Sequence, residues 1–563
     1  MQRIKTKFKK VASTHTGRKI IFGILFFLLV AIAGALWYWN THKKAILRNK
    51  LENAVREKSG GLYNIKFDSL DMDEINGYLS ITNMILLTDS TRFQQLKSMG
   101  KEPSILMDIH IPEISVSGVK TSRALIDDEI VGRTLEIKNP VIHIIYTNAG
   151  KDSSRKVPPK EIYEQLLGNM DLIQADTVLI TGAQITTSNV RTKKTNAQIQ
   201  GINVMLLDVK VDSSSNADTT RILFAKKISI SCGKVAWTSD SKLYHYSADS
   251  ISMSSVSRDF RIKSFRMAPT MNEDAFVRSL PAQDDRFDFS FSNIQLQNID
   301  LLQLFEENLV ADSMLVGSAS FKIYRDLIIP RDTKNRVGYY PQQSIQRIPA
   351  SFKVGKVIVS GGFLEYKERN HITRQSGKVQ FYSLYGSINN FTNDKKAIAV
   401  NNIMTVDLNS RFLNKTPMKV SWVFYLLNPK GRFDVKGSMG PIEGTDLNVL
   451  TEPMGPASIK KGRINGAEFN LQGHNYGMDG TVRFLYEDLR VTMLEKDKGV
   501  KELDKKSLLS FIANIAIKNS NPKKNEETRV AQVHLDRDIN HSIFYLAWKT
   551  IFKGLKETAG LKQ

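Results

Sequence analysis

The sequence predicts a mainly β protein that begins with an N-terminal transmembrane helix. The helix is followed by an elongated, repeat-built antiparallel β-sheet with a groove-like apolar face, a few capping helices and C-terminal amphipathic helices. Three observations predict this class: one long uncharged segment, extensive period-two alternation and a weak internal repeat. With 41% hydrophobic and 24% charged residues, the 563-residue chain has an ordinary globular composition rather than a disordered one.

The first element is the predicted membrane span, residues 20–39, which read IIFGILFFLLVAIAGALWYW. Twenty residues without a charge match about 30 Å of hydrocarbon at roughly 1.5 Å per residue. The aromatic residues at its end are typical of a membrane–water interface. The residues assigned to the anchor are Ile20, Phe26, Leu29, Trp37 and Trp39.

The charge distribution predicts the orientation of this span. Residues 1–60 hold thirteen lysines and arginines against two glutamates, a net +11 of the chain's +22, and residues 1–19 form a basic tail. The positive-inside rule places that tail in the cytoplasm and the bulk of the chain on the other side of the membrane. The alternative is a signal peptide cleaved after Ala31-Ile32-Ala33, although the apolar run continues past that point. No basic helix or aromatic–basic motif concentrates charge elsewhere, so we expect no nucleic-acid partner.

Residues 40–61 are predicted to form a stalk helix that ends at Gly60-Gly61. Residues 62–495 are predicted to form one β-rich domain, because apolar and polar residues alternate through most of this range. The clearest run is 286–296, where the apolar phase slips after Phe291 and predicts a bulge. Runs at 420–426, 482–484 and 489–493 alternate in the same way.

A weak repeat places apolar residues at i, i+2, i+7 and i+9, with a glycine near i+5. One copy begins at Ile228 and Ile230, a second at Val357 and Val359, and a third at Val178 and Ile180. Each copy is interpreted as a strand, a tight turn and a second strand, which together make a hairpin with one apolar face. The spacing between copies is unequal, so no short-period solenoid is predicted.

Helical spacing is rare. It predicts capping helices at 160–174 and 300–312. In the C-terminal segment, residues 496–563, it predicts helices at 507–517 and 541–555 with one strand between them at 529–535. The last helix is strongly amphipathic, and it suits a partner surface, a membrane surface or packing against the sheet.

The sequence contains no catalytic signature of the serine hydrolase, zinc protease or nucleotide-binding type, so no enzymatic role, metal or cofactor is expected. Asp108 and His110 share one strand face, but they are too few for a metal site. Cys232, the only cysteine, excludes an internal disulfide and is interpreted as a small buried residue rather than a nucleophile.

The chain resembles the AsmA-like family of bacterial envelope proteins, which is related to TamB and to the eukaryotic bridge-like lipid transfer proteins. The resemblance covers nearly the whole chain in plan, from the basic N-terminus and anchor to the β repeats. The motifs that carry it are Phe67-Asp68-Ser69-Leu70, Gly77-Tyr78-Leu79-Ser80-Ile81, Ile114-Ser115-Val116-Ser117-Gly118, Ile137-Lys138-Asn139-Pro140-Val141-Ile142, Gly462-Arg463-Ile464 and Tyr486-Glu487-Asp488-Leu489-Arg490-Val491. The resemblance implies phospholipid movement between inner and outer membranes, or control of outer-membrane assembly, and no catalytic residues.

The expected function is therefore binding and transfer of phospholipids or other acyl lipids along an apolar groove, each buried CH₂ contributing about 0.8 kcal/mol. The candidate lining residues are Val178, Ile180, Ile228, Ile230, Phe287, Phe289, Phe291, Val357 and Val359. The first alternative is a non-enzymatic scaffold or assembly factor that contacts outer-membrane or other envelope proteins through exposed sheet edges. The second is an anchored hydrolase with a catalytic triad assembled only in space.

Overall fold

The computed structural model describes residues 52–560, apart from residues 54, 58, 74–75, 120–128, 148–171, 191–194, 213, 216–217, 219, 223, 372, 455–456, 495–511 and 515–517. The chain is mainly β, as predicted. It divides into two compact units. Unit 1 takes its residues from Met1–Asp240, Tyr246–Lys263 and Asp300–Glu307, and unit 2 from Ser241–His245, Ser264–Ile299 and Asn308–Gln563. The range 62–495, predicted as one domain, thus contributes to both.

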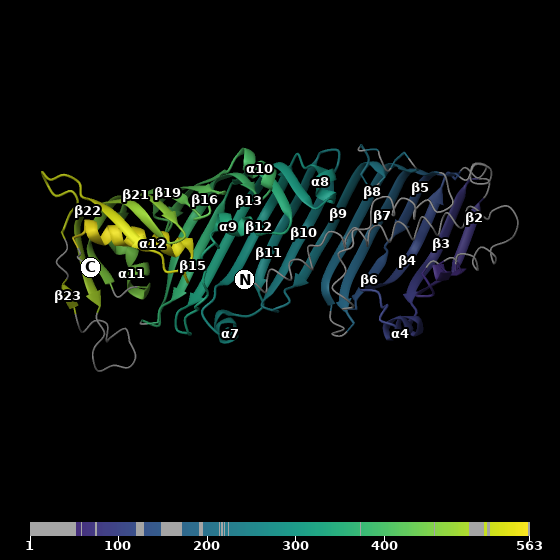
Figure 1. Cartoon of the computed structure of the whole chain (residues 1–563), viewed down its shortest axis with the longest axis horizontal. Coiled ribbons are helices and arrows are strands. Elements are labelled where there is room, and N and C mark those ends of the chain that lie inside the picture. The colour runs from purple at the N-terminus through teal and green to yellow at the C-terminus, as the bar shows by residue number, and fades with distance from the viewer. Residues whose placement is uncertain are drawn as a thin grey trace. The chain divides into compact units, whose positions relative to one another are not determined.

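Unit 1 contains a sheet whose strands lie side by side (Figure 1). The first two strands both pair with the third, and from the third on each strand pairs with the next along the chain, apart from the interruption described below. The strands are β1 (Tyr63–Lys66), β2 (Ser69–Asp73), β3 (Tyr78–Thr88), β4 (Ile105–Ser117), β5 (Glu129–Lys138), β6 (Val141–Tyr146), β7 (Leu172–Asn189), β8 (Thr195–Val211) and β9 (Ala225–Thr238). The helices are α4 (Ser90–Ser98), which Asp89 caps by accepting from Arg92 N, and α8 (Leu301–Phe305). Strands β10 (Tyr244–Ser254) and β11 (Asp259–Pro269) have residues in both units.

Unit 2 contains the remaining strands, again paired largely in chain order (Figure 1). They are β12 (Arg286–Gln297), β13 (Asn308–Asp326), β14 (Ser351–Val359), β15 (Gly362–Arg369), β16 (Ser376–Thr392), β17 (Ile403–Phe412), β18 (Thr416–Tyr425), β19 (Phe433–Met439), β20 (Ile442–Glu443), β21 (Ala457–His474), β22 (Gly477–Leu494), β23 (Ile512–Asn514) and β24 (Val530–Asp536). The helices are α7 (Glu273–Arg278), α9 (Pro341–Ile345), α10 (Lys395–Val400), η1 (Gly444–Leu447), α11 (Asn448–Met454) and α12 (Ile543–Thr558).

The sheets are not purely antiparallel, which corrects the prediction. Strands β5 and β6 form one interrupted strand that is antiparallel to β4 but parallel to β7. Strands β14 and β15 likewise form one interrupted strand, parallel to β13 and antiparallel to β16. A parallel neighbour requires a crossover of about a dozen residues or more, and residues 327–350, which include α9, provide one of them.

The repeat marks a change of phase within single strands, so its interpretation as a hairpin is wrong. All five positions of the copy from Ile228 to Trp237 lie in β9, and those of the copy from Val178 lie in β7. Residues with left-handed φ interrupt the alternation in mid-strand, for example Asn83, Gly182 and Asn293 at 49°, 66° and 51°. The residue with left-handed φ adds one position between two apolar pairs and keeps both pairs on the same face. Buried residues therefore recur at i, i+2, i+5 and i+7. The set Leu79, Ile81, Met84 and Leu86 in β3 shows this spacing.

Hydrophobic clusters hold each of the two units together. In unit 1 the core contains the apolar side chains of one face of β1–β9. In unit 2 one cluster lies between α12 and strands including β19, β21, β22 and β24, and α12 crosses β22 in Figure 1. A second cluster in unit 2 packs Leu450 of α11 against β21 and β22. The C-terminal helix therefore covers part of the apolar face of the unit-2 strands.

Several predicted helices differ in the structure. Residues 512–514 form strand β23 on β22, where a helix was predicted, so the C-terminal segment has two strands rather than one. Residues 172–174 belong to β7, and the helix predicted at 300–312 is only the short α8, because β13 begins at Asn308. The predicted span at 20–39 and most of the stalk lie outside the described residues. Within the residues that are described, no helix is long and apolar enough to cross a bilayer.

Candidate functional site

The candidate residues of unit 1 fall on two neighbouring rows of paired side chains. One row contains Ile180 and Ile230, and the other contains Val178 and Ile228. The first row, the unit-1 ladder, runs across six strands through Ile81, Ile114, Ile137, Ile180, Val204 and Ile230. Residues that pair directly across strands share a face of the sheet, so each of the two rows is one continuous apolar strip.

Most of the unit-1 strip is buried. Val178, Ile180 and Ile228 are 2%, 7% and 2% exposed, and Ile230 packs against the same core while remaining partly exposed. Burying side chains of this size contributes about 1.5–3 kcal/mol each. These residues therefore stabilise unit 1, and a ligand reaching them would have to displace core contacts.

The candidate residues of unit 2 occupy a face that is partly exposed. Phe287, Phe289 and Phe291 of β12 all keep intermediate solvent exposure. Phe289 pairs with Phe321 of β13, and the row continues as the unit-2 ladder, Phe289, Phe321, Leu364, Phe381 and Phe412. The first four members are partly exposed, and only Phe412 is buried. This strip is an apolar surface that a ligand can reach without unfolding the sheet.

Aromatic packing holds the unit-2 ladder in shape. The ring centroids of Phe289 and Phe321 lie 5.3 Å apart in an edge-to-face arrangement, and those of Phe291 and Phe321 are equally close. Phe287 lies 5.2 Å from Phe289 along β12. Such pairs contribute about 0.5–1.5 kcal/mol beyond the area that they bury. The strip is therefore preorganised rather than loosely exposed.

A polar rim borders one side of this strip, where Arg325 lies two residues beyond Ile323 in β13 and Glu368 lies two residues beyond Tyr366 in β15. The Nε of Arg325 donates to Asp285 at 2.7 Å, and the hydroxyl of Tyr366 donates to Glu368 at 2.7 Å. Burial, and then the Glu368 carboxylate, raises the pKa of Tyr366, so its phenol stays neutral. Because Arg325 already has a carboxylate partner, the rim offers no uncompensated cation for a phosphate. The strip is suited to hydrocarbon rather than to a particular headgroup.

Val357 and Val359 lie on the same face beyond the change of phase. Val357 is 6% exposed and pairs with Met314 and Ile388, whereas Val359 remains partly exposed. Their two rows run from β12 through β18 and continue into β19, and Trp422, on the Val357 row, is partly exposed. The structure thus brings Phe287, Phe289, Phe291, Val357 and Val359 together on one face of unit 2.

The residues considered for chemistry are not assembled into a reactive site. Cys232 is only partly buried, whereas the sequence predicts a buried residue, and this partial burial raises the pKa of its thiol, which disfavours the reactive thiolate. Asp108 instead accepts hydrogen bonds from the backbone and hydroxyl of Thr88. Across the described ranges, no group of three or more His, Cys, Asp or Glu residues could hold a metal ion.

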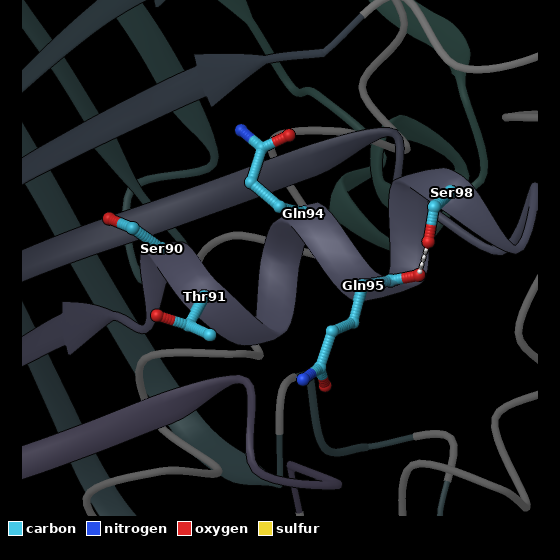
Figure 2. A pocket seen from close by; sticks show the side chains of 5 residues that line it. All are labelled: Ser90, Thr91, Gln94, Gln95 and Ser98. Carbon is cyan, nitrogen blue, oxygen red and sulfur yellow. Dashed lines mark hydrogen bonds between the residues drawn. The ribbon is translucent and has the colours of Figure 1, made fainter.

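A shallow pocket lies on helix α4 and is lined by five exposed polar residues, Ser90, Thr91, Gln94, Gln95 and Ser98 (Figure 2). Ser98 donates a hydrogen bond to the Gln95 carbonyl at 2.8 Å, within the helix itself. None of the five lining residues is charged or hydrophobic, so the pocket offers little to orient a substrate.

The sequence alone does not identify the residues on neighbouring strands that pair with the candidates and join them into one strip. Phe321, Leu364 and Phe381 alternate in their own strands, but only strand pairing aligns them with Phe289. No family model matches this chain, and no curated protein matches it.

Proposed function

We propose that this chain is a membrane-anchored, periplasmic lipid-binding protein of the AsmA-like type, which supports phospholipid transport or outer-membrane homeostasis. The single observation that supports this function best is the partly exposed, aromatic unit-2 ladder. Acyl chains would lie along this strip and be shielded from water. In this proposal residues 20–39 anchor the chain in the inner membrane and no catalytic step is involved.

Site-specific photocrosslinking in the full chain tests this proposal. Phe289 is replaced by p-benzoylphenylalanine, and the chain is expressed in bacteria grown with radiolabelled phosphate. We expect irradiation to attach labelled phospholipid to the Phe289 position. The matched control places the same reagent at Ser290, the next residue on the opposite face of β12.

Labelling several-fold stronger at Phe289 than at Ser290 would support lipid binding by the ladder. Equal labelling at both positions would indicate incidental contact with membrane lipid, and absence of label at Phe289 in a folded chain would refute the proposal. Circular dichroism of the purified variants checks that both retain β structure.

The alternative, a non-enzymatic scaffold or assembly factor for outer-membrane proteins, is favoured by a different observation. The unit-1 ladder is buried, as a purely structural core would be. If crosslinking at Phe289 yields envelope proteins instead of lipid, the scaffold is the better description of the function.

A further inference from the structure

The C-terminal helix α12 has two apolar sides. One packs against the strands of unit 2, and the other is largely exposed, with the Phe544 ring meeting that of Trp422 in β18 at a centroid distance of 5.9 Å. Ile543, Leu546 and Ala547 are 2%, 2% and 6% exposed and join the core above β22 and β24. Gly554 lies so close to β22 that an added Cβ would come within 2.4 Å of Val482. The inner side is thus fully used in docking the helix.

The outer side of α12 presents large aromatic side chains to solvent. Phe544, Trp548 and Phe552 are 63%, 50% and 42% exposed, and Tyr545 is 36% exposed. The first three are spaced four residues apart, so they form a single stripe along the helix. The rings of Trp548 and Phe552 stack with centroids 5.8 Å apart. A stripe of this kind is costly in water and is typical of an interaction site.

Basic groups flank the stripe. Helix α12 carries Lys549, Lys553 and Lys556 against Glu557, a net charge of +2. The ammonium of Lys549 lies 5.4 Å from the centre of the Tyr545 ring, and that of Lys556 lies 5.4 Å from the centre of Phe552. Lys553 is engaged by the carbonyl of His534 at 2.9 Å, so Lys549 and Lys556 are the cations placed beside the rings.

The N-terminal end of the helix adds no net opposing charge. Asp538 forms an ion pair with Arg331. His541 stacks on Tyr545, and burial lowers the pKa of this histidine to about 4, so it is neutral at neutral pH. Glu368, which also faces Tyr545, accepts the Tyr366 hydroxyl. The outer side is therefore aromatic, with a positive border.

We propose that the outer side of α12 docks on the surface of a bilayer that contains anionic phospholipid. Tryptophan, tyrosine and phenylalanine partition into the headgroup region, and lysines beside them attract anionic headgroups. Because the inner side holds the helix on the sheet, the contact is shallow and brings unit 2 to a membrane surface. This docking does not require lipid binding by the unit-2 ladder, nor does the ladder require docking.

An environment-sensitive fluorophore on α12 tests the docking in the full chain. Cys232 is replaced by serine, Phe552→Cys supplies the only thiol, and the labelled chain is held in nanodiscs. Vesicles of phosphatidylcholine with about one phosphatidylglycerol in four are then added. We expect a blue shift of the emission that is lost at high salt and absent with phosphatidylcholine alone. The control label is at Met99→Cys, a 62% exposed residue just after α4.

Two further variants separate the aromatic and the charged contributions. In the labelled chain, Phe544→Ser with Trp548→Ser is expected to abolish the shift, and Lys549→Gln with Lys556→Gln to weaken vesicle binding several-fold. Phe544, Trp548 and Lys549 are exposed and Lys556 is partly exposed, so the fold should persist, which circular dichroism checks.

No shift with anionic vesicles, an equal shift at Met99, or an equal shift with phosphatidylcholine alone would each overturn the docking. If α12 does not bind vesicles but lipid is still crosslinked at Phe289, only the docking proposal is refuted. If α12 binds anionic vesicles but no lipid is crosslinked at Phe289, only lipid binding by the unit-2 ladder is refuted.

Discussion

Asn293 adopts a φ of 51° in the middle of β12, where its strand neighbours are extended. Asparagine tolerates the left-handed region better than most residues, and β-branched residues tolerate it poorly. Its partner across the strand pair is Gly317, where an added Cβ would come within 2.9 Å of the Asn293 Cβ. This pair lets Phe287, Phe289 and Phe291 share a face with Ile294 and Leu296.

We predict that Asn293→Val destabilises unit 2 by about 1–3 kcal/mol, because valine is strained at this φ. Asn293→Gly should change stability by less than about 1 kcal/mol, because glycine adopts the same conformation freely. Thermal unfolding of the full chain measures both. The matched control is Ser292→Val, next to it in an extended position of the same strand. Equal losses at 292 and 293 would show that backbone conformation is not the cause.

Among the secondary structure elements, the strands are predicted well and their connections poorly. The run at 286–296 becomes β12, and 541–555 becomes α12, because alternation and helical spacing are local signals. The glycine in the repeat predicts a turn, but the same pattern, a glycine between two pairs of apolar residues, also fits a change in the phase of alternation within one strand. Likewise, Ile512–Asn514 becomes a strand because the long β22 offers it an edge to pair with, which helical spacing cannot reveal.

The contact between α12 and β22 depends on one glycine. An added Cβ at Gly554 would lie 2.4 Å from the Cβ of Val482, closer than real contacts allow. We predict that Gly554→Ala destabilises unit 2 by about 1–3 kcal/mol through overpacking, even though alanine favours helix by about 1 kcal/mol. Chemical denaturation measures the loss.

Two controls accompany this prediction. Lys549→Ala, on the exposed side of the same helix, should change stability by less than about 0.5 kcal/mol. In a chain that carries Val482→Gly, Gly554→Ala should cost less stability than it does alone, because Val482→Gly removes the Cβ and both methyl groups that the new Cβ would meet. If the two losses simply add, the helix does not rest on Val482 as the structure indicates.

At the scale of the whole molecule, the two units use the same strand pattern to different ends. Alternation identifies which face of each sheet is apolar, but it says nothing of what covers that face. The sequence therefore placed Ile228 and Phe289 in one class of lining residue. The structure separates them, since Ile228 is 2% exposed in the core of unit 1 and Phe289 remains partly exposed in unit 2.

A substitution to aspartate should consequently affect folding in unit 1 and lipid binding in unit 2. Ile228→Asp buries an unpaired carboxylate, so we expect a loss of at least about 3 kcal/mol and a protease-sensitive unit 1. Phe289→Asp places its carboxylate at a partly exposed position, so the chain should stay folded and resist protease. Lipid crosslinking, with the photoreactive residue now at Phe321, should then fall several-fold, because a charge interrupts the apolar strip. A Phe289→Asp chain that keeps full crosslinking would show that lipid does not follow the ladder, whereas a stable Ile228→Asp chain would show that the unit-1 face is more open than its burial indicates.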